Sequence, residues 1–169
     1  MRITRRHLLA LSAGTTAAAA LVAGGVVAQW WDQPPEEPFS VLDNDEAGFI
    51  RAWAGAAYPS TPTIPLHGHS AGLDRFFDHM LKTMPSDSVK LLRLLINALN
   101  NATYPTDRAA FSALPQPRQK QIFDDWIHSD LDPFRSATQS LVLLLGMGWS
   151  IHPDVRPHML KLHSCGYGK

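Results

Sequence analysis

Apolar side chains recur every three or four positions through most of residues 42–146, which predicts a series of amphipathic α-helices. Asp43 followed by Glu46 has the spacing of a capping box, so a first helix is expected from there to just before Pro59. Further helices are expected over 70–84, 86–99, 116–129 and 134–146, with a short helical piece beginning near residue 106. No apolar–polar alternation exceeds about four residues. The pattern therefore predicts an all-α fold, a small bundle of about five helices.

Proline and glycine mark the segments between and after these helices. The stretch YPSTPTIPLHGH, residues 58–69, holds three prolines and is expected to be a non-helical loop. The run LVLLLGM, residues 141–147, is apolar on all sides, so we expect it in the centre of the bundle. From about residue 148 the chain is punctuated by Pro and Gly, which predicts an irregular C-terminal tail.

The first 28 residues have the composition of an export signal. Arg5 and Arg6 precede 21 uncharged residues, 8–28, of which only seven are Leu or Val. A paired arginine ahead of a weakly apolar run resembles a twin-arginine signal. Cleavage is expected between Ala28 and Gln29. Two alternatives remain open: a general secretory signal, and an N-terminal helix that is never cut and tethers the protein to a membrane.

The predicted signal sets the expected segment boundaries and the expected cellular location. We expect residues 1–28 to be the signal, 29–41 a Pro-rich and acidic linker, and 42–169 one helical domain with its tail. The twin-arginine route carries folded proteins. The predicted location is therefore the periplasmic side of the inner membrane, and the first partner is the twin-arginine translocase.

Composition excludes several classes of function. After loss of residues 1–28 the chain has a net charge near −3, with no basic excess to attract nucleic acid. Cys165 is the only cysteine, which excludes an internal disulfide, a Cys-x-x-Cys-His haem site and a thiolate iron–sulfur cluster. Neither GxGxxG nor GxxxxGK[ST] occurs. We therefore expect no cofactor in this chain.

Histidines are the remaining candidates for site chemistry. His67 and His69 lie in the Pro-rich loop and His79 follows on a helix, which makes these three the candidate metal ligands. A second set in the tail comprises His152, His158, His163 and Cys165. Neither set has the spacing of a known metal motif, so solvent-facing histidines are the simpler interpretation. A triad hydrolase stays open as well, because such triads converge in space rather than in sequence.

Aromatic residues point to protein contacts. Trp53 and Trp126 fit helical stripes and are expected in the core. Four aromatic residues in segments expected to be irregular are the candidate partner contacts: Trp30, Trp31, Trp149 and Tyr167. The alternative is that these side chains pack against the chain's own bundle.

Four stretches carry a recognisable pattern: FSVLDNDEAGFIRAWAGAAYPSTPT, SAGLDRFFDHML, FSALPQPRQKQIFDDW and FRSATQSLVLLLGMGWSIHP. Together they resemble the gluconate 2-dehydrogenase subunit 3 family, the small subunits of membrane-associated dehydrogenase complexes, and the likeness covers about residues 1–155. The matching motif positions are Leu42, Glu46, Pro59, Ser60, Thr61, Ala71, Gly72, Phe76 or Phe77, and Asp78. The family offers no catalytic residue to transfer.

The resemblance implies a function through a partner. In such complexes an FAD-containing subunit of the glucose–methanol–choline type oxidises a sugar or alcohol, and a cytochrome c accepts the electrons. The small subunit carries the export signal, and the folded flavoprotein crosses with it. The alternative from the histidines is a free-standing periplasmic metal-binding protein or hydrolase.

Overall fold

The computed structural model describes residues 33–162 of the 169-residue chain. Several sequence-based predictions fall on residues outside this range and are not addressed by the structure: Arg5, Arg6, Ala28, Gln29, Trp30, Trp31, His163, Cys165 and Tyr167.

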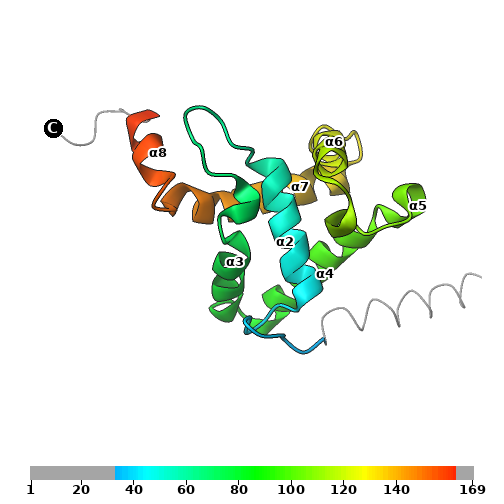
Figure 1. Cartoon of the computed structure of the whole chain (residues 1–169). Coiled ribbons are helices and arrows are strands. Elements are labelled where there is room, and N and C mark those ends of the chain that lie inside the picture. Colours follow the sequence, from blue (N-terminus) through cyan, green and yellow to red (C-terminus); the bar gives the residue numbers. More distant parts are fainter. Residues whose placement is uncertain (1–32, 163–169) are drawn as a thin grey trace, which may run out of the picture. The chain divides into compact units, whose positions relative to one another are not determined.

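The all-α prediction is confirmed, and the described residues contain no β-strand. The α-helices are α2 (Asn44–Ala57), α3 (Leu73–Lys82), α4 (Ser86–Asn101), α5 (Tyr104–Asp107), α6 (Gln116–Ile127), α7 (Asp132–Ile151) and α8 (Arg156–Leu162). Two 3₁₀ turns, η1 (Gly68–Ser70) and η2 (Phe111–Ala113), lie between them. Helix α2 is central, with α3 on one side and α4 and α6 on the other, while α7 passes behind it in this view (Figure 1).

Helix α2 begins where the sequence predicts. The Asp43 carboxylate accepts a hydrogen bond from the Glu46 backbone N–H at 2.7 Å, and the Asp43 N–H donates to the Glu46 carboxylate at 3.1 Å. This is the predicted capping box, which satisfies two N–H groups left free by helix geometry. Downstream, Phe49, Ile50 and Trp53 are fully buried, so the helix lies in the core.

An aromatic cluster joins α2 to the second half of the chain. The Trp53 ring centroid lies 5.3 Å from that of Phe123, 5.5 Å from Phe111 and 5.9 Å from Trp126. Trp126 in turn stacks on Phe134 of α7 at 5.5 Å. Offset and edge contacts of this kind stabilise aromatic pairs beyond the area they bury. Trp53 is fully buried as predicted, whereas Trp126 is half-buried at the cluster's edge.

The prediction of an irregular tail from residue 148 is wrong for residues 148–151 and 156–162, which are helical, whereas residues 152–155 form a turn between α7 and α8. Helix α7 continues to Ile151 because Leu145 and Trp149 extend its buried stripe by one more turn. Gly148 allows this turn to approach α3, since a Cβ there would lie 2.5 Å from the Phe76 ring. Pro157 does not prevent α8, because in the first turn of a helix its missing N–H costs no bond.

A buried carboxylate on α3 holds the segment that leads into α2. The backbone N–H groups of Ser40, Val41 and Leu42 all donate to Asp78 at 2.8–3.1 Å. Asp78 is 7% exposed, so water is a poor substitute for it. The predicted linker, residues 29–41, is thus non-helical as expected in its described part but is tied to the domain at its end.

We predict that Asp78→Ala lowers the free energy of unfolding by about 3 kcal/mol, because three backbone donors lose their charged acceptor in a buried site. Urea unfolding followed by tryptophan fluorescence measures this. The control is Asp74→Ala on the same helix, a carboxylate equally buried but with one donor, half-exposed Arg51, so its loss should cost about 1 kcal/mol. Equal losses for the two variants would contradict the role given to Asp78.

Candidate functional site

The predicted metal ligands do not form a common site. His67 is the N-cap of η1 and His69 lies within it, and the His67 Nδ1 accepts a hydrogen bond from the His69 backbone N–H at 3.3 Å. His79 is exposed on α3. Among residues 33–162, no three His, Cys, Asp or Glu side chains are grouped so that they could hold a metal ion. Two of the four residues of the second set, His163 and Cys165, lie outside the described residues.

Trp149 belongs to the interior, which corrects its assignment as a partner contact. Its indole is 7% exposed and stacks on the Tyr58 ring with centroids 5.2 Å apart and planes 16° from parallel. The Tyr58 hydroxyl donates to the Val142 carbonyl of α7, and burial raises the pKa of Tyr58 to about 12. Tyr58 therefore stays protonated at physiological pH and links the end of α2 to α7.

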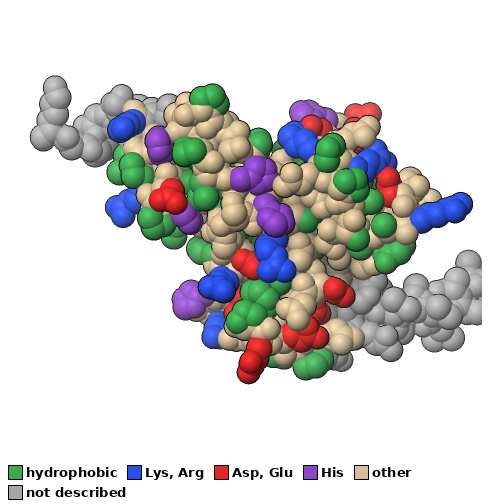
Figure 2. Space-filling view, viewed as in Figure 1, with side chains coloured by type: hydrophobic (Ala, Val, Ile, Leu, Met, Phe, Trp, Pro, Cys, Tyr) green, Lys and Arg blue, Asp and Glu red, His purple; other side chains and the backbone are tan. Residues whose placement is uncertain are grey.

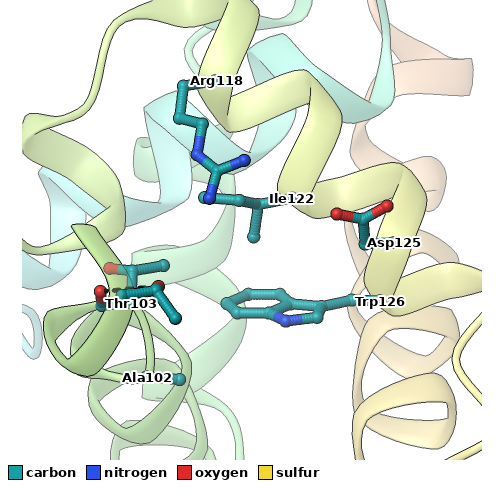
Figure 3. Close-up of a pocket in the computed structure, with 7 residues that line it drawn as sticks. Ala102, Thr103, Arg118, Ile122, Asp125 and Trp126 are labelled. Atoms are coloured by element: carbon teal, nitrogen blue, oxygen red, sulfur yellow. Dashed lines mark hydrogen bonds between the residues drawn. The ribbon is translucent and has the colours of Figure 1, made fainter.

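An open pocket of about 210 Å³ lies at the end of α4 and is bordered by α5 and α6 (Figure 3). Its lining residues are Ala102, Thr103, Thr106, Arg118, Ile122, Asp125 and Trp126. The Arg118 guanidinium points into this space but bonds to Asp107 at 2.7 and 3.0 Å and to Gln121 at 2.8 Å. The hydrogen bonds from Arg118 and then Thr106 lower the pKa of Asp107. The lining contains no His, Cys or Ser, and its two hydroxyls are engaged: Thr103 donates to the Ala109 carbonyl at 2.6 Å and Thr106 to the Asp107 carboxylate at 2.7 Å.

A second polar cluster is buried between α2 and α4. The Arg93 Nε donates to both Glu46 carboxylate oxygens at 2.9 and 3.0 Å, and the Asn97 amide donates to one of them at 2.7 Å. Burial raises the pKa of Glu46, while the hydrogen bond and charge of Arg93 oppose that shift. Glu46 and Arg93 are 1% and 5% exposed, so this cluster serves the packing of two helices and is closed to a substrate.

The sequence contains a signal for this cluster that the helical pattern alone does not reveal. Arg93 lies on the core-facing side of α4, four positions after Val89 and three before Ile96. A charged residue within an apolar stripe indicates a buried partner. Two residues matched by the family resemblance, Glu46 and Asp78, thus have structural roles in this chain.

The outward face of α7 is the clearest candidate for function. Leu143, Met147 and Ile151 follow one another at four-residue intervals and are 73%, 51% and 63% exposed. The opposite face of the same helix is buried in the core through Leu141 and Leu145. This corrects the expectation that residues 141–147 are covered on all sides. Soluble proteins seldom expose such a row without a binding role.

The residues that flank this row along α7 are uncharged. No Asp, Glu, Lys or Arg occurs between Arg135 and Asp154. The exposed hydroxyls are turned back to the helix, because Ser140 donates to the Ser136 carbonyl and Ser150 to the Met147 carbonyl. In Figure 2, the hydrophobic side chains over α8 and the adjoining end of α7 lie among Lys or Arg, His and Asp or Glu side chains, so the uncharged stretch is confined to α7 itself. Loss of charge at the centre with apolar side chains is typical of protein interfaces.

The composition of α7 raises the question of a membrane span. Within the part of the chain that the structure describes, no helix has both the length and the apolar character to cross a bilayer.

Comparison with known proteins adds no assignment. No protein-family model, no curated protein and no solved structure matches the chain.

Proposed function

We propose that this protein is a non-catalytic accessory subunit that binds a folded flavoprotein dehydrogenase and accompanies it through the twin-arginine pathway. The catalytic partner would hold FAD, belong to the glucose–methanol–choline type and act on a sugar or alcohol, with a cytochrome c as electron acceptor. The complex would work on the periplasmic side of the inner membrane.

The observation that carries this proposal is the uncharged, apolar outward face of α7. A helix that buries one side in its own core and exposes Leu143, Met147 and Ile151 on the other suits a second protein. The export-signal pattern with Arg5 and Arg6 supports the transport role, because that pathway accepts partners that are already folded. The family resemblance supports the class of the partner.

We predict that a C-terminally tagged chain, purified from its native cell, brings with it a larger protein with the absorption spectrum of bound flavin. Replacing Arg5 and Arg6 by Lys should leave both proteins in the cytoplasm, because the translocase reads the paired guanidinium groups rather than charge alone. Cell fractionation and blotting of the two proteins measure this.

The matched control is Arg2→Lys, which alters an arginine outside the pair and should leave export intact. A wild-type chain that elutes alone and colourless would contradict the proposed function. N-terminal sequencing of the exported chain decides between cleavage before Gln29 and a retained tether.

A further inference from the structure

The exposed row on α7 has a defined length and direction. Helical rise of about 1.5 Å per residue places Leu143 and Ile151 about 12 Å apart along the axis, with Met147 midway. Each step of four residues turns by about 40°, so the row runs obliquely along one side of the helix. We call these three residues the α7 row. The row is too narrow to be a pocket and suits the face of another element.

Cationic residues follow the α7 row at its C-terminal end. Arg156 and Lys161 of α8 are both exposed, and Leu160 beside them is 66% exposed. No Asp or Glu follows Asp154 in the sequence. At the other end of α7, Arg135 forms an ion pair with Asp132 within the same helix. The surface is thus apolar along α7 and carries two exposed cations on α8, with the exposed Asp154 carboxylate in the turn between the two helices.

We propose that the α7 row and Leu160 dock a folded protein partner whose contact face is apolar and bordered by Asp or Glu carboxylates opposite Arg156 and Lys161. This inference rests on the proposed function and names the surface that the dehydrogenase subunit would cover. The apolar side chains hold the complex, and the opposite charges set its orientation and association rate.

A second copy of this chain fits the surface less well. An antiparallel pair of α7 helices would bring the cations of one copy toward Asp132 of the other, and that carboxylate already has Arg135 as its partner. A lasting interface also needs about 800 Å² from each partner, which a row about 12 Å long does not supply by itself. A larger partner that also covers α8 meets this requirement.

A lipid surface fits less well too. Helices that lie on membranes carry Lys and Arg along the border of their apolar side. The exposed residues beside the α7 row are Ser136, Gln139 and Ser140, none of them charged. The cations occur only on α8, which suits a partner with localised carboxylates.

Photo-crosslinking in the native cell tests the surface. The photoreactive amino acid p-benzoylphenylalanine is placed at Met147, and at Leu91 of α4 as a control of similar exposure. We expect a light-dependent adduct from position 147 to the flavin-binding chain and none from position 91. The crosslinked peptide should be apolar and bordered by Asp or Glu.

Charge variants give a second measurement. Met147→Glu should reduce the flavoprotein recovered with the tagged chain about tenfold or more, because a carboxylate is then buried against an apolar face. Leu91→Glu should leave recovery unchanged. Circular dichroism and thermal unfolding of both variants establish that each is folded. The pair Arg156→Glu and Lys161→Glu should weaken recovery most at low salt.

The other outcomes overturn the inference in distinguishable ways. An adduct of two copies of this chain, or an adduct to lipid alone, identifies a different occupant. A flavoprotein that crosslinks from position 91 and not from 147 moves the docking surface elsewhere but leaves the proposed function standing. A wild-type chain that recovers no flavoprotein overturns both.

Discussion

Replacing Gly68 by alanine is expected to lower the free energy of unfolding by about 3–5 kcal/mol, because the added methyl group has no space. A Cβ at this position would lie 2.0 Å from the Ala54 carbonyl oxygen and 2.7 Å from its carbon, and 3.0 Å from the Tyr58 Cβ. The first two atoms belong to the backbone of α2 and cannot rotate away. Urea unfolding, followed by circular dichroism, measures the loss.

Gly48→Ala provides the matched control on α2. A Cβ there meets no atom within 4 Å, so the substitution should raise stability by about 0.5–1 kcal/mol through helix propensity. Opposite signs for two Gly→Ala changes identify steric contact as the cause. A loss below about 1 kcal/mol for Gly68→Ala would mean that the loop moves away from α2 at little cost.

The position of Gly68 connects the fold to the candidate surface. Its backbone N–H donates to the Tyr58 carbonyl at 2.8 Å, which anchors the Pro-rich loop against the end of α2. Tyr58 in turn bonds to α7 through Val142 and stacks on Trp149. The loop therefore helps to hold α7 with its apolar row outward, and this contact requires glycine at position 68, where no Cβ fits.

Local signals account for the parts of the fold that the sequence predicts. Four helix starts depend on residues within one helical turn and can therefore be read from the sequence: the capping box of α2 at Asp43 and the starts of α4, α6 and α7. The start of α3 differs, because Ser70 ends η1 and the helix follows Gly72 at a φ of 65°. Glycine adopts this left-handed conformation readily, but it adopts several others as well, so the sequence alone does not show that α3 starts after Gly72.

The candidate surface could not be predicted in the same way. Residues 141–147 are apolar on every side, so their pattern does not distinguish a covered face from an open one. The outcome depends on how many neighbours reach α7, which is a property of the whole fold. The same reason explains Trp149, whose place in the core follows from the Tyr58 ring beneath it.

The buried ion pair is a further case in which partners distant in sequence decide the outcome. Arg93 and Glu46 are 47 residues apart, and only the packing of α4 against α2 brings them to 2.9 Å. The pair needs its full set of donors, because an unpaired charge in such a site is very unfavourable. Removing Arg93 from this ion pair therefore tests how strongly the pair stabilises the packing of α4 against α2.

Arg93→Met should lower the free energy of unfolding by about 3–5 kcal/mol near pH 7.5, since Glu46 is left buried without its cation. The loss should shrink toward about pH 5. Burial already raises the pKa of Glu46, and loss of Arg93 removes the strongest opposing influence. A carboxyl whose folded-state pKa is raised binds its proton more tightly when folded, so its contribution is greatest at low pH and is lost as pH rises through that pKa.

The double variant Glu46→Gln with Arg93→Met separates this charge effect from lost packing. The double variant has no ionisable group at position 46. Its free energy of unfolding should be close to that of Arg93→Met near pH 5 and higher than that of Arg93→Met near pH 7.5. Chemical unfolding of the wild type and both variants at the two pH values makes the comparison. A deficit for Arg93→Met that is the same at both values would mean that packing, rather than the uncompensated carboxylate, stabilises the contact between α2 and α4.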